Sequence, residues 1–439
     1  MAAPQAGAPA LGNRRVLAIA LPIVLSNATI PILGAVDTGV IGRLGEAAPI
    51  GAVGIGAVIL ASIYWIFGFL RMGTSGLVAQ AQGAGDRGEV GAHLVRALAI
   101  AFVLGVAMIL LHPLLFAAAF RLAPASSEVE TLARQYLAIR IWGAPATIAL
   151  YAITGWLIAM ERTRGVLALQ LVQNGLNIGL DILFVLGLGW GSGGGAAATL
   201  VSELAGLSLG LWFCRAVLRV ALGQAGLFAR AQMARLIRVN SDIMIRTVLL
   251  QGAFTSFMFL GAGLGDVTLA ANQVLLQFLS IVAYGLDGFA FAAETLVGQA
   301  VGARRPDLLR RSVRLTSGWA AGGALMLGLV FAIFGPALID ALTTAPEVRV
   351  EARHYLPWLV VMPLIGIVSW MFDGIFIGAT LTRQMRRAMI ESVAIYAAAL
   401  LILLPVFGNN GLWAALMVLN IARALTMARF YPEAEAAAR

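Results

Sequence analysis

The strongest constraint in this sequence is the length of its apolar runs. Many of them approach or exceed the ~20 residues that an α-helix needs to cross the hydrocarbon core of a bilayer. Apolar residues make up 60% of the chain and charged residues only 12%, about half of the ~25% that is usual in soluble domains. A soluble fold of 439 residues needs more charge on its surface. The sequence therefore predicts an all-α integral membrane protein.

We expect twelve transmembrane helices. Several exceed the minimum length, which indicates helices that are tilted or kinked. Residues 1–13 are polar and small and no cleavage site follows the first run, so we expect an anchored first helix rather than a cleaved signal peptide. The predicted spans are residues 14–40, 50–82, 94–118, 130–160, 165–188, 194–216, 236–262, 268–301, 312–340, 353–379, 386–406 and 411–430.

Arginines distinguish the two sides of the membrane. One set of alternate loops holds most of them, and we count Arg96 and Arg423 in this set. Positive residues favour the cytoplasmic side, so we expect both termini in the cytoplasm and the protein in the bacterial inner membrane. The net charge of +9 then faces lipid headgroups rather than nucleic acid. The opposite loops hold only Arg43, Arg121, Arg134, Arg349 and Arg353.

The chain also contains an internal repeat. Residues 77–84 (LVAQAQGA) are similar to residues 296–303 (LVGQAVGA), and the glycine-rich turn at 191–195 has a partner at 408–411. We predict two pseudo-symmetric six-helix lobes, an N-lobe at 1–220 and a C-lobe at 221–439. Six is an even number, so the lobes insert with the same orientation and are related by an axis along the membrane normal.

Carboxylates inside the predicted spans are the main functional candidates. An ionised Asp at a helix centre costs about 2.5–3.5 kcal/mol on insertion scales. Asp37 is the strongest candidate because it lies deep in an apolar helix with Ser26 on nearly the same face. Pro22 lies upstream in that helix, where it removes a backbone hydrogen bond and can act as a kink point.

The fifth span carries a polar stripe. Asn174, Asn177 and Asp181 are spaced at i, i+3 and i+7, which places them on one helical face. Such a stripe must face the protein interior or a water-filled cavity. It is either a site for a cation or a hydrogen-bonded seam between helices, although a seam does not need the charged Asp. Thr199 on the sixth span could add a hydroxyl.

Other charged residues also fall within spans. Asp287, Glu294 and Asp373 lie in the second half, where they are candidates for substrate contact or lobe packing. The acids of one half have no acidic counterparts in the other, so the scaffold is duplicated and the carboxylates are not. This asymmetry favours function over folding. We expect Arg140 and Arg246 to reach the membrane surface or to pair with a local carboxylate.

At these residues the sequence resembles the MATE (multidrug and toxic compound extrusion) transporters, and within them the DinF-like branch. The resemblance covers the chain after residue 12. The matching stretches are residues 36–38, 77–84, 174–181 and 372–379.

The resemblance implies a twelve-helix antiporter with a central cleft between its lobes, which couples cation entry to export of cationic, amphipathic compounds. In DinF-like members, the residues that match Asp37, Asn177, Asp181 and Thr199 form the N-lobe cation site, with Asn174 beside them here on the same stripe. The proline that matches Pro22 is associated with bending of the first helix. The other branch, NorM-like, relies on C-lobe acids. Here Asp242 lies too early in its helix to serve there, although Asp373 is present.

We hypothesise that Asp37 and Asp181 titrate as a coupled pair, so that proton entry bends the first helix and expels the substrate. The same oxygens could bind Na⁺, so both H⁺ and Na⁺ remain candidates for the coupling ion. A lipid-linked oligosaccharide flippase of related fold is an alternative, but it should line its cleft with arginine. No catalytic motif is visible, so we expect that the protein is not an enzyme and needs no cofactor beyond the coupling ion. We also expect it to be a monomer.

Overall fold

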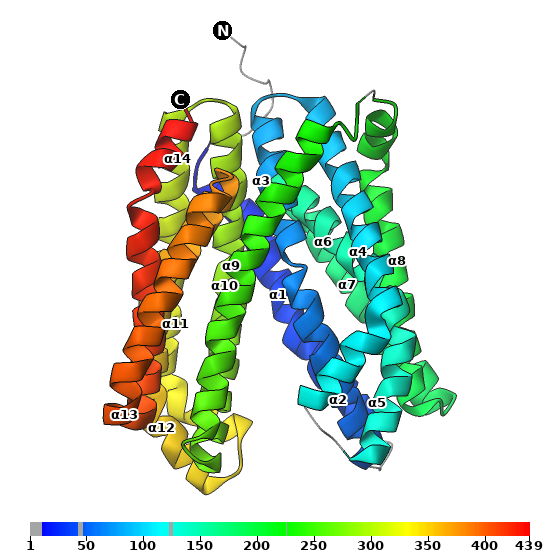
Figure 1. Ribbon diagram of the computed structural model, residues 1–439, viewed down its shortest axis with the longest axis vertical. Coiled ribbons are helices and arrows are strands. Elements are labelled where there is room, and N and C mark those ends of the chain that lie inside the picture. The colour runs from blue at the N-terminus through cyan, green and yellow to red at the C-terminus, as the bar shows by residue number, and fades with distance from the viewer. Residues whose placement is uncertain (1–10, 43–46, 123–125, 225) are drawn as a thin grey trace. The chain divides into compact units, whose positions relative to one another are not determined.

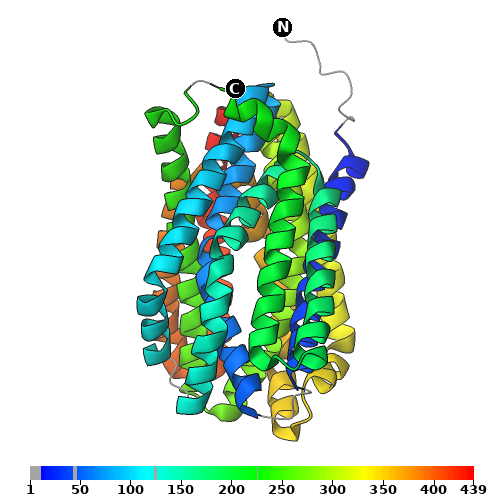
Figure 2. The ribbon, with the colours of Figure 1, turned by 90° about the vertical axis from the view of Figure 1, so that its right-hand side faces the viewer.

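A computed structural model of the chain describes residues 11–42, 47–122, 126–224 and 226–439. The side chains of residues 31–38, 41–42, 47 and 122 lie outside the described part. Within these ranges every regular element is a helix, as both views of the ribbon show (Figures 1 and 2). The all-α prediction is therefore confirmed for the described chain.

The N-terminal half supplies six spans, three of which are interrupted. Each interruption lies inside a stretch that hydropathy alone predicts as one continuous helix. The elements are α1 (Asn13–Gly42); α2 (Ala47–Ile66) and α3 (Phe69–Gly83); α4 (Arg87–Leu122); α5 (Ser127–Arg140), the 3₁₀ turn η1 (Ile141–Gly143) and α6 (Ala144–Ala159); α7 (Thr163–Asp181) and the π-helical η2 (Ile182–Gly187); and α8 (Gly191–Leu222).

The C-terminal half has longer, less interrupted helices. Its last two predicted spans form one element, α13, with a kink at Gly408, where φ is 54° and ψ is −129°. A positive φ favours glycine because a Cβ clashes with the backbone there. The elements are α9 (Arg230–Ala262), α10 (Asp266–Gly302), α11 (Pro306–Leu342), α12 (Pro346–Gly378), α13 (Thr382–Ala428) and the short α14 (Tyr431–Ala437).

These helices are suited to a bilayer. Ten stretches of the described chain are long and apolar enough to cross a membrane. The stretch Thr382–Ala428 contains two of the predicted spans, and α1 supplies one more, so the prediction of twelve is confirmed for the described residues. Large apolar side chains such as Leu401 (80% exposed) and Leu110 (73% exposed) lie on the outer surface. Lipid tails stabilise such a surface, whereas water does not.

The helices form two compact units, and three helices are divided between them. One unit contains residues 25–78 and 86–240, and the other contains residues 1–24, 79–85 and 241–439. The dividing points fall within α1 after Val24, within α3 after Val78 and within α9 after Asn240. The first helix of each half is therefore shared: its N-terminal end belongs to one unit and the rest belongs to the other.

The repeated segment makes a reciprocal contact within the second unit. A Cβ added at Gly83 would overlap the backbone oxygen of Gln299, and a Cβ added at Gly302 would overlap the backbone oxygen of Gln80. Gly83 and Gly302 hold the same place in the repeat, as do Gln80 and Gln299. The two copies thus cross each other symmetrically, at a distance that only glycine permits.

Replacing Gly302 by Ala tests this crossing. The added methyl group must push the two backbones apart, so we expect Gly302→Ala to destabilise the protein by about 1–3 kcal/mol, as overpacked cores do. The measurement is thermal unfolding of the purified protein in detergent.

Gly318→Ala is the matched control. Gly318 also lies in a helix, α11, but no atom lies within 4 Å of a Cβ built there. We expect no loss of stability in this variant. Equal melting temperatures for the two variants would contradict the importance of the close crossing.

Candidate functional site

The polar stripe of α7 faces the interior of its unit. Asn174, Asn177 and Asp181 are all buried, with Asn177 1% and Asp181 3% exposed. On the opposite side of the helix, Val172 is 47% exposed. The structure therefore places the three polar side chains on the buried face, as their spacing predicts.

Asn174 connects α7 to α1. Its Nδ2 donates to Thr29 Oγ1 at 2.9 Å, and its Oδ1 accepts from Gln170 Nε2 at 2.9 Å. Thr29 in turn donates to the backbone oxygen of Ser26 at 2.7 Å. These bonds join the stripe to the part of α1 that lies between Pro22 and Asp37.

Asn177 connects α7 to α8. Its Nδ2 donates to Thr199 Oγ1 at 3.2 Å, and Thr199 donates to the backbone oxygen of Gly195 at 2.9 Å. Thr199 lies close to Asn177, as the resemblance to the MATE transporters implies. Its hydroxyl oxygen, the Asn177 amide and the Asp181 carboxylate provide the neutral and anionic oxygen donors that hard cations prefer.

Asp181 lies at a change of helix type. It is the last residue of α7, and the six-residue π-helical segment Ile182–Gly187 follows it directly. π-Helical turns occur frequently at functional sites, because the inserted residue rotates the side chains that flank it. The position of the carboxylate beside this segment supports a functional role.

Two predicted residues lie on α1. Asp37 belongs to the helix, but its side chain lies outside the described residues, so its pairing with Asp181 remains a prediction. Pro22 lies within the same helix and is partly buried. It is two residues before the point where α1 passes from one unit to the other.

A buried ion pair lies in the same unit. Arg140 Nη2 donates to Glu203 Oε1 at 3.0 Å, and Arg140 Nη1 lies 2.9 Å from Glu203 Oε2. Glu203 is one helical turn beyond Thr199 on α8, so both point to the same side of that helix. Gly143 leaves room for the carboxylate, because a Cβ there would overlap Glu203 Oε2. The expectation that Arg140 pairs with a local acid is confirmed.

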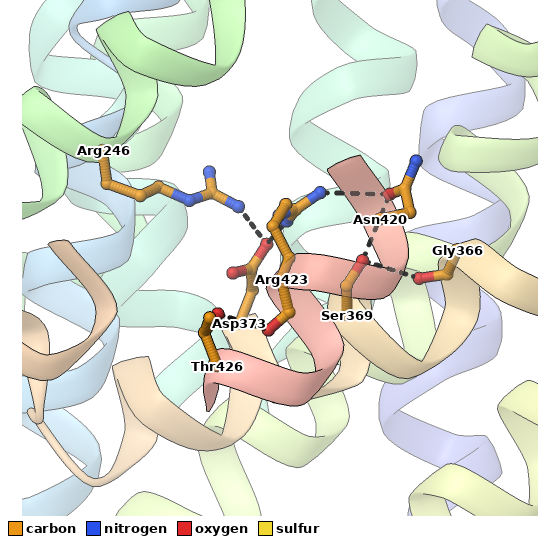
Figure 3. Close-up of polar contacts among 7 residues, drawn as sticks. All are labelled: Arg246, Gly366, Ser369, Asp373, Asn420, Arg423 and Thr426. Carbon is orange, nitrogen blue, oxygen red and sulfur yellow. Dashed lines mark hydrogen bonds and ion pairs between the residues drawn. The ribbon is translucent and has the colours of Figure 1, made fainter. Parts of the chain in front are cut away.

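The other unit contains the C-lobe candidates. Asp373 on α12 forms ion pairs with Arg246 on α9 and with Arg423 on α13, both through its Oδ2 atom (Figure 3). Arg423 Nη2 lies 2.6 Å from that oxygen. Asp287 and Glu294 both lie on α10. Asp287 is partly buried, and Glu294 is buried, with 1% of its surface exposed. Among the described residues, Asp373 therefore contacts arginines rather than the acids of α10.

Two arginines that we counted as loop residues are in fact buried. Arg96 lies in α4, where its Nη1 contacts Glu89 at 2.7 Å, and Arg423 lies in α13. Both are close to the predicted ends of spans, which hydropathy does not locate exactly enough to separate a loop arginine from a helical one. Asp242, which is buried inside α9, pairs with Arg386 at 2.6 Å.

No group of three or more His, Cys, Asp and Glu side chains that could hold a metal ion is found among the described residues. The arrangement in the first unit is a different kind of site. It consists of the Asp181 carboxylate, the Asn174 and Asn177 amides and the Thr199 hydroxyl group. Such a set can bind a proton or a monovalent cation.

Comparison with known proteins agrees with this architecture. The MatE family profile matches residues 22–183 and 243–403. DNA damage-inducible protein F of Escherichia coli (strain K12) is 38% identical over 417 residues, which cover 94% of this chain and 90% of that protein. The probable multidrug resistance protein NorM of Neisseria meningitidis serogroup A is 25% identical over 346 residues, covering 76% and 74%.

The fold is also that of solved transporters. An outward-facing multidrug resistance MATE family transporter of the MOP superfamily superposes with a TM-score of 0.87 at 18% identity, covering 97% of this chain and 96% of that one. The family match and the fold together define a multi-pass membrane transporter. The chain belongs to the MATE family, and its similarity to the E. coli protein confirms the resemblance to the DinF-like branch.

The Arg140–Glu203 pair makes a testable prediction about stability. Removing one member leaves an uncompensated buried charge, so we expect Arg140→Met to cost about 3–5 kcal/mol. The double variant Arg140→Met with Glu203→Met removes both charges and should recover most of this loss. Thermal unfolding of the three proteins in detergent gives the comparison, and a double variant no more stable than the single one would contradict a paired role.

Proposed function

We propose that this protein is a cation-coupled antiporter, most simply proton-coupled, which exports cationic or amphipathic compounds by alternating access. The observation that carries the proposal is the buried polar stripe of α7, which is bonded to α1 through Asn174 and to α8 through Asn177. A buried carboxylate within membrane-spanning helices is costly and is retained where ions or substrates pass. The multidrug names of several relatives support drugs as the substrate class.

The coupling step takes place at Asp181 and Asp37. Burial and mutual repulsion favour the neutral form of at least one carboxyl group in such a pair. Protons that enter from the outside neutralise the pair and remove the negative charge that attracts a cationic substrate. Release of the protons to the cytoplasm restores that charge, so proton and substrate use the same site in turn.

The conformational step takes place in α1. Pro22 removes one backbone hydrogen bond from the helix and lowers the cost of bending there. The stripe on α7 contacts α1 through Thr29, which lies on the far side of Pro22 from the N-terminus. A change of charge at Asp181 and Asp37 is therefore transmitted to the part of α1 beyond the proline.

The proposal includes the setting of the protein. It is a monomer in the bacterial inner membrane with both termini in the cytoplasm, surrounded by lipid and using no cofactor apart from the coupling ion. The Asn177, Asp181 and Thr199 oxygens also suit Na⁺, so the ion is decided by experiment.

Asp181→Asn tests the coupling site. The amide preserves size and polarity but cannot take up or release a proton, so we expect gradient-driven substrate export to fall to the level of protein-free vesicles. Asp37→Asn should behave in the same way. The measurement is efflux of a fluorescent cationic dye from proteoliposomes with an imposed pH gradient or an imposed Na⁺ gradient.

Asp340→Asn is the control for that experiment. Asp340 lies at the end of α11, partly exposed, and pairs with Arg349 and Arg353, so its loss should not alter transport. Efflux driven by Na⁺ but not by pH would replace the proton by Na⁺ in the proposal. Wild-type efflux by both Asp→Asn variants would refute the site.

Pro22→Ala tests the hinge. Alanine restores the missing backbone hydrogen bond and favours a straight α1, so we expect slower export with unchanged binding of the dye and equal or higher thermal stability. Dye binding to the purified protein and initial efflux rates separate these effects. An unchanged rate would show that bending at Pro22 does not limit the cycle.

A further inference from the structure

The turn between α10 and α11 carries far more positive charge than its counterpart in the first half. Residues 304–314 contain five arginines and one aspartate, which gives a net charge of +4. Residues 85–95 hold the same place in the repeat and contain one arginine, one aspartate and one glutamate, which gives −1 with His93 neutral. We expect both turns on the cytoplasmic side, so the orientation of the chain does not require this excess.

Two of the five arginines are paired within the protein. Arg305 Nη2 lies 2.7 Å from Asp307 Oδ2, and Arg310 Nη2 lies 2.6 Å from Glu435 Oε2 on α14. The other three are exposed and form no ion pair in the part of the chain that the structure describes: they are Arg304, Arg311 and Arg314. The excess charge of this turn is therefore available to a partner outside the chain.

Arg304 has a backbone conformation that favours glycine. Its φ is 53°, and Gly85, which holds the same place in the first copy, has a φ of 75°. Glu161 and Thr380 also have a positive φ, and the Thr380 hydroxyl group accepts a hydrogen bond from Gln80. The side chain of Arg304 forms no hydrogen bond with the described residues. An arginine kept where glycine is favoured indicates a function for its charge.

Arg311 and Arg314 lie on the face of α11 that points away from the core of its unit. They are spaced at i and i+3, and Gly318 follows at i+7 on the same face. All three are exposed, and no atom lies within 4 Å of a Cβ built at Gly318. Further along the helix, Leu325 is 51% and Leu329 is 53% exposed. The face is thus basic at one end, then open, then apolar, which matches the headgroup and the acyl chain of a phospholipid.

Trp319 connects this part of α11 to α1. Its side chain is 39% exposed, and tryptophan is enriched where the membrane meets water. Its Nε1 donates to Asn13 Oδ1 at 3.1 Å, and Asn13 is the first residue of α1. Arg14, the next residue, is exposed and adds a further positive charge. A lipid bound to this end of α11 therefore lies near the start of the helix that we propose to bend during export.

We propose that Arg304, Arg311 and Arg314 bind the headgroup of an anionic phospholipid of the cytoplasmic leaflet, and that the bound lipid increases the rate of export. The phosphate oxygens supply both the negative charge and the acceptors for guanidinium groups that have no partner in the described chain. The apolar residues further along α11 favour a lipid over a soluble anion. The effect on rate rests on the proposed export function, whereas the binding of the lipid does not.

Lipid binding is measured first and without transport. Full-length protein in a neutral detergent is titrated with phosphatidylglycerol or with zwitterionic phosphatidylcholine, and the bound lipid is counted by native mass spectrometry. The triple variant Arg304→Gln, Arg311→Gln, Arg314→Gln should bind phosphatidylglycerol more weakly by roughly tenfold or more, since each arginine near an anionic lipid surface contributes to the affinity. Its binding of phosphatidylcholine should not change. Wild-type affinity for phosphatidylglycerol in this variant would overturn the inference.

A second triple variant is the matched control. Arg219→Gln, Arg383→Gln and Arg387→Gln remove three other exposed arginines that form no ion pair among the described residues. The change in net charge is the same as in the first triple variant, so this protein should bind phosphatidylglycerol as tightly as the wild type. Equal weakening in the two triple variants would assign the effect to net charge and overturn the site.

Arg304→Gly should change stability and binding in different directions. Glycine relieves the left-handed conformation, so the variant should melt at the same temperature as the wild type or higher when only phosphatidylcholine is present. Its affinity for phosphatidylglycerol should nevertheless fall severalfold. Retained stability shows that the loss of affinity does not come from misfolding, and an unchanged affinity would overturn the role of Arg304.

Dye efflux from proteoliposomes tests the effect on export. The wild type and the control triple variant should export faster when phosphatidylcholine vesicles also contain phosphatidylglycerol, whereas the first triple variant should export at one rate in both. An equal gain in all three proteins would overturn the effect on rate. Absence of efflux from every protein, together with the expected lipid binding, would overturn the proposed function and support this site.

Soluble glycerol 3-phosphate separates a lipid from a free phosphate compound. It carries the charged part of the headgroup without the acyl chains. Phosphatidylglycerol should remain bound to the wild type in its presence, because the apolar part of α11 contributes to binding. Displacement of the lipid by equimolar glycerol 3-phosphate would assign the arginines to a soluble phosphate compound and overturn the inference.

Discussion

The hydrocarbon core of a bilayer cannot solvate charge, and most features of this protein follow from that constraint. Every backbone polar group in the hydrocarbon core must be bonded inside its own helix, so every regular element of the described chain is a helix. A charged side chain inside a span either pairs with an opposite charge or is retained because it has a function. The Arg140–Glu203 pair shows the first outcome, and the buried Asp181 beside its π-helical segment indicates the second.

The same constraint explains how far the sequence could be interpreted. Apolar runs give the number of spans and their approximate positions, since lipid selects for apolar side chains along the whole helix. Helix interruptions were not predictable in this way: the break after Ile66, the 3₁₀ turn after Arg140 and the π-helix after Asp181 change no hydropathy. Gly408 suggested a turn between two helices, and the structure shows a kink within one element.

The candidate site was predictable in part. The common face of Asn174, Asn177 and Asp181 follows from helical periodicity, and its burial follows from the cost of polar groups in lipid. The bond between Asn177 and Thr199 joins neighbouring helices and could be inferred only by resemblance to a family. The partners of Asp373 come from α9 and α13, far apart in the sequence, and Arg423 was mistaken for a loop residue. Contacts of this kind depend on tertiary packing, which periodicity does not encode.

The reciprocal glycine contact carries a consequence for the origin of the chain. Gly83 contacts Gln299, and in the same way Gly302 contacts Gln80. An isologous interface, in which one surface patch contacts a second copy of itself, has this pattern of contacts. Two separate six-helix chains related by a twofold axis along the membrane normal would form the same contact. The crossing could therefore have served as the dimer interface of an ancestral half-length protein, and gene fusion then made the two copies free to differ. In one chain the two copies are free to differ, and their carboxylates do differ.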